Sequence, residues 1–326
     1  MAPSPRSVPP SWKAALCALV LLLSVLVPLA SESLRQGPLP PASRTAAGVF
    51  TGSDATGIGR LAAVEKWRGR GLLLAGHTYL PGGTWRDIEG PPELLAPWAR
   101  WRHQRVDRVF VLNVPMLDHS EEGLSDEQVR ALLGQGARGA FDDHFRRLAQ
   151  RLVDLQLTDT IVVLGWEMNG VTYTHRCAPD PGAWQTYWRR IVTAMRTVAG
   201  RRFRFDFAPS RGRDAVPWTD CYPGDAYVDI IGMDSYDQPE GLTFRGQVDE
   251  PYGLRAQVRF AARHHKPVSY PEWGLFRNGD DADYMREMAR WFRTYRPVYQ
   301  TLTDYCPHGV WECAAHPEAA RAYRAR

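Results

Sequence analysis

The chain has 326 residues, of which 44% are hydrophobic and 11% aromatic, including 12 tryptophans. This length and apolar content allow one large domain with a well-buried core. The abundance of aromatic rings is also typical of grooves in which ring faces bind weakly polar ligands. The formal net charge is +4, and basic residues are mixed with acidic ones throughout. Because no dense basic run is present, nucleic acid is not expected as a partner.

The N-terminal region has the pattern of an export signal. Arg6 and Lys13 precede an apolar stretch at residues 14–30, and small residues follow it. The stretch is about 17 residues long, which is the short limit for a membrane span. We therefore expect a secreted or extracytoplasmic protein, with the segment either cleaved or retained as an anchor. The predicted organisation is a signal peptide or signal anchor at 1–33, a Pro- and Ser-rich linker at 34–47, and one domain at 48–326.

The cysteine content fits an exported protein. Four cysteines remain when Cys17 of the signal segment is set aside, and an even number in such a chain indicates disulfides. Sequence cannot fix their connectivity, but we prefer Cys177–Cys221 and Cys306–Cys313. The cysteines lack the close paired spacing of zinc ligands. We expect no metal and no cofactor.

Short apolar runs alternate with longer segments of helical periodicity from residue 48 onward. Two of the runs, at 108–114 and 160–165, are almost continuously apolar, which is typical of parallel strands buried on both faces. About eight such units predict an α/β fold, a single-domain (β/α)8 TIM barrel. The predicted strands are Gly48–Thr51, Gly71–Ala75, Arg108–Val114, Thr160–Gly165, Phe203–Ala208, Val228–Met233, Pro267–Tyr270 and Val298–Leu302.

Capping signals indicate where helices begin between these strands. Ser125 and Gln128 have the spacing of a capping box, and Asp180 followed by proline is a typical helix start. Apolar residues recur at helical spacing over 252–265 and 281–295. These helices are the connections that parallel strands require.

Two glutamates follow predicted strands on opposite sides of the barrel. Glu167 comes directly after the fourth strand and Glu272 after the seventh. Groups at the carboxyl ends of barrel strands share one rim, so the two carboxylates are expected to face each other. Glycoside hydrolysis needs such a pair, one protonated to donate to the leaving oxygen and one ionised. A separation of about 5–5.5 Å predicts retention of configuration, and about 6.5–9.5 Å predicts inversion.

Other polar and aromatic residues near the strand ends are candidates for sugar binding. Apolar neighbours such as Trp166 and Trp273 would raise the pKa of one glutamate. Each candidate also has a structural interpretation, since a lone glutamate after a strand is often ion-paired and a lone histidine is often hydrogen-bonded in the core. The candidate substrate-binding residues are His77, Trp85, Trp166, Asn169, Tyr236 and Trp273.

Three motifs together resemble glycoside hydrolase family 26, which contains β-mannanases and other β-glycanases. They are Gly-Trp-Glu-Met-Asn-Gly at 165–170, the run ending Gly-Met-Asp-Ser-Tyr-Asp at 222–237, and Lys-Pro-Val-Ser-Tyr-Pro-Glu-Trp-Gly at 266–274. The resemblance covers roughly residues 48–305. It implies a (β/α)8 barrel and a retaining mechanism, with Glu167 as acid/base and Glu272 as nucleophile. It also implies that Tyr236 hydrogen-bonds the nucleophile.

The chain departs from the pattern of typical family mannanases at three positions. Trp166 stands where those enzymes have a histidine, Val163 where they have an arginine, and Phe207 where they have a tryptophan. These positions shape the subsite at the scissile bond. The resemblance therefore predicts the catalytic carboxylates without predicting which glycan is bound.

The predicted function is a retaining glycoside hydrolase that acts on β-glycosidic bonds of a polysaccharide or oligosaccharide, as a monomer. A transglycosylase would use the same residues but transfer the sugar to another sugar. A catalytically inactive, cell-surface carbohydrate-binding protein is an alternative of a different class. A metal-dependent hydrolase has the least support, because His and Asp do not recur at ligand spacing on the strand ends.

Overall fold

The computed structural model describes residues 45–69 and 71–325. The predicted signal segment at 1–33 and nearly all of the predicted linker lie outside the described residues. Within the described part, no helix is both long enough and apolar enough to cross a membrane.

The strands form one sheet in which all neighbours run parallel, in the order β6-β5-β4-β3-β2-β1-β9-β8-β7. The strands are β1 (Ala46–Phe50), β2 (Ala75–Tyr79), β3 (Val109–Val114), β4 (Ile161–Leu164), β5 (Arg204–Phe207), β6 (Ile230–Ile231), β7 (Ser235–Tyr236), β8 (Tyr270–Gly274) and β9 (Tyr299–Thr303).

The two strands at the ends of this order belong to one continuous segment, and that segment closes the barrel. β6 and β7 are separated only by residues 232–234. On one side, the N–H groups of Gly232 and Asp234 donate to the carbonyls of Phe207 and Pro209. On the other side, Ile231 bridges to Val268. β6 and β7 therefore occupy one strand position together, and the nine strands fill the eight strand positions of a (β/α)8 barrel. This confirms the predicted fold.

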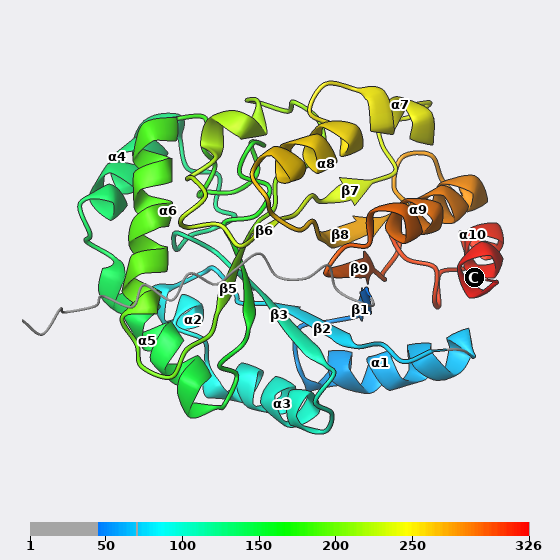
Figure 1. The fold of residues 1–326 in the computed structure, drawn as a ribbon, viewed down its shortest axis with the longest axis horizontal. Helices are drawn as coiled ribbons and strands as arrows, with labels where there is room; N and C mark the ends of the chain where they lie inside the picture. Colours follow the sequence, from blue (N-terminus) through cyan, green and yellow to red (C-terminus); the bar gives the residue numbers. More distant parts are fainter. Residues whose placement is uncertain (1–44, 70, 326) are drawn as a thin grey trace, which may run out of the picture. The chain divides into compact units, whose positions relative to one another are not determined.

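Helices surround the central strands (Figure 1). They are α1 (Ala55–Arg68), α2 (Trp85–Ile88), α3 (Pro92–His103), α4 (Asp126–Ala137), α5 (Asp142–Asp154), α6 (Pro181–Arg196), the 3-10 helix η1 (Trp218–Cys221), α7 (Phe244–Asp249), α8 (Leu254–Arg263), α9 (Ala282–Tyr295) and α10 (Pro317–Arg324). The expected capping box at Ser125 and the Asp180 cap are both present, at the starts of α4 and α6.

The apolar core has two parts, one inside the barrel and one between the sheet and the helices. Close packing in the outer layer depends on Gly76 of β2, because a Cβ there would lie 2.5 Å from the ring of Trp101 on α3. The interior part contains Ala46, Leu74, Ala75, Val111, Ile161, Val163, Trp166, Ala208, Ile230 and Tyr299. These side chains fill most of the barrel, whose interior also contains the buried Asp206, hydrogen-bonded by Ser269 and Tyr299.

Most predicted strands differ from the observed ones by one or two residues, but two predictions were displaced. The second strand was expected at 71–75 and lies at Ala75–Tyr79, and the seventh was expected at 267–270 and lies at Tyr270–Gly274. In both cases the polar residues that we placed after the strand are inside it. An apolar run identifies only the part of a strand that is buried in core on both faces. The C-terminal part of the strand carries the polar side chains that point into the barrel mouth.

Both expected disulfides are present, Cys177–Cys221 and Cys306–Cys313. The first joins the loop that follows β4 to η1, which follows β5. The second closes a short loop after β9. Both therefore constrain loops at the carboxyl ends of the strands, which is the end where a barrel carries its site.

Candidate active site

A cleft of about 300 Å³ opens where several strands end. One wall carries Glu272, and aromatic rings make up much of the remainder. The lining residues are Phe50, Ser53, Tyr79, Leu80, Pro81, Gly82, Pro115, Ser120, Glu121, Trp166, Tyr173, Glu272 and Tyr305. They come from the ends of β1, β2, β3, β4, β8 and β9, so the cleft lies at the end of the barrel predicted for a site.

Glu272 reaches the cleft from within strand β8. The pairing of β8 with β9 shifts register between Tyr270 and Trp273, which marks an irregularity of the bulge type. Such an irregularity changes the direction of a side chain without ending the strand. Accordingly, Glu272 lines the cleft, while Trp273 packs outward on Phe292 of α9.

The carboxylate of Glu272 accepts hydrogen bonds from three neutral side chains. The hydroxyl of Tyr236 donates to Oε2 at 2.7 Å, and the amide of Asn113 donates to Oε1 at 3.2 Å. Tyr79 is the third partner. Burial raises the pKa of Glu272, while these donors act to lower it because they stabilise the charged form. The backbone N–H of Glu272 donates to Asp234, 3.0 Å away, which fixes the strand at this point.

Glu167 lies on a tight turn after β4. Its φ of 50° is in the left-handed region, which costs a non-glycine residue about 1–3 kcal/mol and is often found at functional sites. The turn is held by the N–H of Glu167, which donates to the carbonyl of Ala208 at 2.8 Å. The side chain accepts one hydrogen bond, from the hydroxyl of Ser210 at 2.8 Å.

Burial, then the charge of Glu272, and to a smaller extent that of Asp214 raise the pKa of Glu167 to about 8. The hydrogen bond from Ser210 acts in the opposite direction. At neutral pH this leaves Glu167 protonated, while Glu272 has the donors that favour a carboxylate. Two carboxyl groups in such unequal surroundings are suited to act as an acid and a nucleophile.

His77 and Asn113 form a buried pair behind Glu272. Nε2 of His77 lies 2.8 Å from Oδ1 of Asn113, and Asn113 in turn donates to Glu272. Both side chains are fully buried. Burial lowers the pKa of His77 to about 4, so its ring is neutral at ordinary pH. We therefore correct the expected contact of His77 with ligand, because its ring orients Asn113 instead.

Asn169 supports the partner of the other glutamate. Its Oδ1 accepts from the N–H of Ser210 at 2.9 Å, and its amide donates to the carbonyl of Ser210 at 3.1 Å. Asn169 is fully buried. It therefore fixes the loop after β5 and places Ser210 next to Glu167, a different role from the predicted contact with substrate.

The structure brings Tyr236 and Trp166 to the site but not Trp85 or Trp273. Trp166 lines the cleft. Trp85 stacks between Phe141 and His144, with ring centroids 4.6 and 4.4 Å away. Trp273 is 1% exposed and faces the helix layer. Both predictions of substrate contact are therefore corrected, because each ring has its apolar faces covered by protein.

Several residues of the site were not among the predicted ones. Asn113 is a polar residue inside an otherwise apolar strand, and that break in the pattern could have identified it. Tyr79 belongs to the polar end of β2. Ser210, Tyr173 and Tyr305 lie in loops whose path the sequence does not disclose, and they carried no recognisable signal.

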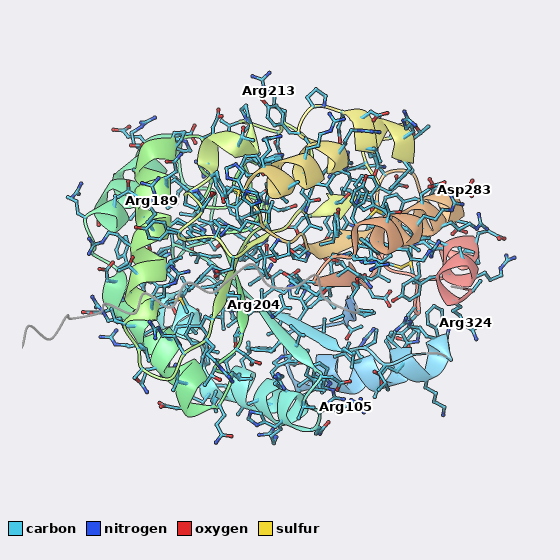
Figure 2. The ribbon with its side chains drawn as sticks, viewed as in Figure 1. Arg105, Arg189, Arg204, Arg213, Asp283 and Arg324 are labelled. Carbon is cyan, nitrogen blue, oxygen red and sulfur yellow. A yellow bond between two sulfur atoms is a disulfide. The ribbon has the colours of Figure 1, made fainter. Side chains whose placement is uncertain are left out.

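Positive charge lies away from the cleft. No Lys, Arg or His is among the described residues that line it. Arg105, Arg213 and Arg324 lie at different edges of the domain (Figure 2). The described residues also contain no group of three or more His, Cys, Asp or Glu side chains that could hold a metal ion.

Comparison with known proteins relates the chain to one family. The family model described as Glycosyl hydrolase family 26 matches residues 143–250, which include Glu167 and Tyr236. No curated protein sequence matches the chain.

Solved structures with the same fold include three mannanases. A Bacillus subtilis mannanase aligns with 16% identity and a TM-score of 0.62, over 86% of this chain and 84% of that one. The catalytic domain of a Bacillus sp. JAMB-750 endo-β-1,4-mannanase gives 16% identity and 0.62, over 87% and 86%. A double mutant of a Cellulomonas fimi endo-β-1,4-mannanase gives 20% and 0.56, over 86% and 77%. At these identities the likeness concerns the fold.

Proposed function

Since the chain is a glycoside hydrolase of family 26, we propose that it cleaves β-1,4-linked mannan-type polysaccharide with retention of configuration. Glu272 is the nucleophile and Glu167 the acid/base. The structurally similar mannanases support this substrate class. Two disulfides support function outside the cytoplasm, where such bonds persist.

The observation that carries the proposal is the unequal environment of the two glutamates. Glu272 accepts hydrogen bonds from Tyr236, Asn113 and Tyr79, all of which favour its ionised form. Glu167 has one hydroxyl donor, and the charge of Glu272 contributes to its pKa of about 8. The resting enzyme therefore holds one carboxylate and one carboxylic acid, which is the starting state of a double displacement.

In the first step, the carboxylate of Glu272 attacks the anomeric carbon and the bond from that carbon to the leaving oxygen breaks. The proton of Glu167 passes to the leaving oxygen as this bond breaks. The products are a sugar with a free hydroxyl and a glycosyl ester of Glu272. Esterification removes the negative charge of Glu272, so the pKa of Glu167 falls and its ionised form becomes available.

In the second step, Glu167 takes a proton from water and the resulting hydroxide attacks the anomeric carbon from the face that the first sugar left. The ester bond breaks and Glu272 regains its charge. Two inversions give net retention. Tyr236 and Asn113 stabilise the carboxylate of Glu272 both before attack and on its release.

Azide rescue of alanine variants tests the two roles separately. Glu272→Ala should lose turnover on β-1,4-mannohexaose by about 10⁴-fold or more. Added azide should then restore activity and give an α-glycosyl azide, because azide replaces the nucleophile in a single inversion. Glu167→Ala, assayed on an aryl β-mannoside with a good leaving group, should give the β-azide.

Matched controls exclude misfolding and other functions. Glu121→Ala removes a carboxylate that lines the cleft but has no assigned catalytic role, and it should keep most of the activity. Wild-type product of inverted configuration would contradict the double displacement. Binding of mannohexaose by calorimetry without any hydrolysis would favour the inactive carbohydrate-binding protein instead.

A further inference from the structure

Two neighbouring loops expose apolar side chains at the end of the barrel opposite the cleft. Because all strands run parallel, the loops that precede them share this end. Val106, in the loop before β3, is 95% exposed, and Leu72, in the loop before β2, is 46% exposed. The two strands begin side by side, since Ala75 pairs with Val109. Each apolar residue lies three positions before its paired residue, so the two loops present them next to each other.

A third exposed apolar ring lies near the point where the chain enters the barrel. Tyr295 is the last residue of α9, just before β9, and is 39% exposed. β1 lies between β2 and β9 in the sheet, and the described chain starts at residue 45, directly before β1. The preceding residues, which include the apolar stretch at 14–30, therefore join the barrel between the loops that carry Leu72 and Tyr295.

Single exposed apolar side chains are ordinary on a protein surface, but a group of them around one point is not. The remaining large hydrophobic residues that are exposed in the described part of the chain are Val171 and Tyr305. Both lie in loops that follow strands, at the cleft end. The loops before β2, β3 and β9 therefore form a separate apolar surface.

Cations surround this apolar surface. Lys66 lies in the last turn of α1, Arg293 in the last turn of α9, and Arg296 directly before β9. All three side chains are exposed, and none forms an ion pair with another described residue. Cations near a helix end also interact favourably with its dipole, but that interaction needs no exposed apolar neighbours. We call the six side chains the entry patch: Leu72, Val106, Tyr295, Lys66, Arg293 and Arg296.

The cleft end has the opposite electrostatic character. Glu121 and Glu272 line the cleft, and no Lys, Arg or His is among its described lining residues. An anionic surface therefore attracts the entry patch and repels the cleft, which orients the domain as it approaches.

We propose that the entry patch, at the end of the barrel opposite the cleft, docks on the surface of a membrane that contains anionic phospholipids. Its apolar side chains enter the boundary between the headgroups and the acyl chains, and its cations lie among the lipid phosphates. The cleft then faces away from the bilayer. This inference goes beyond the proposed function and does not depend on which substrate the cleft binds.

The sequence before the domain supports a membrane as the partner. The expected signal or anchor segment contains the apolar stretch at 14–30, and residues 31–44 connect it to the barrel. A connection of this length spans at most about 50 Å when fully extended. A retained segment therefore keeps the entry patch close to the bilayer. Such a tether raises the local concentration of lipid around the patch, so contacts by a few side chains are sufficient for docking.

Fluorescent probes at the two ends of the barrel test the orientation. The full chain with Cys17→Ser receives either Val106→Cys or Val171→Cys, and an environment-sensitive dye is attached to the new thiol. Val171 is the matched control, because it is an exposed valine (70%) at the cleft end. Both variants keep the same N-terminal segment, so a difference between the probes reports on the domain alone.

The probe at position 106 should shift to shorter wavelength and become protected from iodide on vesicles of phosphatidylcholine with one-third phosphatidylglycerol. It should change much less on vesicles of phosphatidylcholine alone, and high salt should reverse the shift. The probe at position 171 should stay exposed in every case. Equal signals from the two probes, no signal from either, or an equal signal at position 106 on neutral vesicles would refute the proposal.

Paired charge substitutions test the contribution of the cations. Arg293→Gln with Arg296→Gln should lower the docking constant, obtained from the signal at position 106, by about 25-fold, at about fivefold per charge. Arg213→Gln with Arg277→Gln removes the same charge from loops at the cleft end and should leave this constant within about twofold. An equal loss in both double variants would mean that net charge, and not the entry patch, attracts the membrane.

Measurements without vesicles identify other occupants of the patch. A signal at position 106 that grows with protein concentration would indicate a second copy of the chain. A signal caused by soluble dextran sulfate would indicate a polyanion other than lipid. Either result, with no further change on anionic vesicles, would overturn membrane docking. None of these measurements uses glycan hydrolysis, so failure of the proposed function would leave this test intact.

Discussion

The end of β4 and the strand β8 each carry a candidate catalytic glutamate, and the two are held differently. Glu272 remains within a strand, where an irregularity in the pairing with β9 turns it inward. Glu167 has left its strand and lies on a turn with a φ of 50°. The first is fixed by sheet hydrogen bonds on both sides, whereas the second is fixed by loop contacts with Ala208 and Ser210.

This difference in support is matched by a difference in charge. Three neutral donors surround Glu272, and one hydroxyl contacts Glu167. Burial raises the pKa of both groups, and more donors oppose that rise at Glu272 than at Glu167. In the proposed mechanism, two identical side chains take opposite roles because their hydrogen-bond partners differ. Each of the following predictions concerns the protonation or the hydrogen bonds of one of the two glutamates.

The largest expected effect is the loss of wild-type activity at high pH. Glu167 must be protonated to donate, and its pKa is about 8, so kcat/KM should fall about tenfold per unit as pH rises above that value. Glu272 must be ionised, and its raised pKa places the acidic limit above that of an ordinary glutamate. A bell-shaped profile of kcat/KM against pH would agree with this. Activity that stays level up to pH 10 would contradict it.

Tyr236→Phe should remove one of the hydrogen bonds that stabilise the charged form of Glu272. Removing a hydrogen bond to a charged group costs about 1.5–3 kcal/mol, or about 10–100-fold in kcat/KM. The pKa of Glu272 should rise, so the acidic limit moves to higher pH. Tyr284→Phe is the control, because its buried hydroxyl donates to the carbonyl of Ser235 and not to a glutamate. That variant should lose stability without any shift of the limit.

Glu272→Gln should lower the pKa of Glu167 although Glu167 itself is not substituted. The charge of Glu272 is the second cause of the raised pKa of Glu167, after burial. Without that charge, the pKa of Glu167 should fall but remain above 4.5, the ordinary value for glutamate. NMR titration of labelled glutamate carboxyl carbons in the folded variant measures it. An unchanged pKa would mean that the two groups do not interact.

The smallest effect is expected for Ser210→Ala. Its hydroxyl is the group that lowers the pKa of Glu167, so the variant should move the basic limit to higher pH. Activity at neutral pH should change by only a fewfold, because Glu167 stays protonated. Thr186→Ala, which removes an exposed hydroxyl on α6, provides a comparison. A shift to lower pH in Ser210→Ala would reverse the assigned role of this hydrogen bond.

The barrel could be predicted because local pattern and global fold agree in most of it. The apolar runs of β3 and β4 and the capping box of α4 gave correct elements within one or two residues. The prediction was displaced in β2 and β8, where polar residues lie inside the strand. Hydrophobic periodicity cannot identify these strand positions, because the inward-facing residues at the barrel mouth are polar where those deeper in the barrel are apolar.

The sequence by itself determined the fold class and the two candidate glutamates, because apolar periodicity and a carboxylate next to an apolar strand are local signals. The number of cysteines indicated disulfides, but their pairing stayed a preference until the structure showed it. Only the tertiary structure decided what surrounds each glutamate. It put Asn113, Tyr79 and Ser210 next to them, and it removed Trp85 and Trp273 to the helix layer. The side to which a strand residue points depends on the register with its neighbours, and a local pattern does not contain that register.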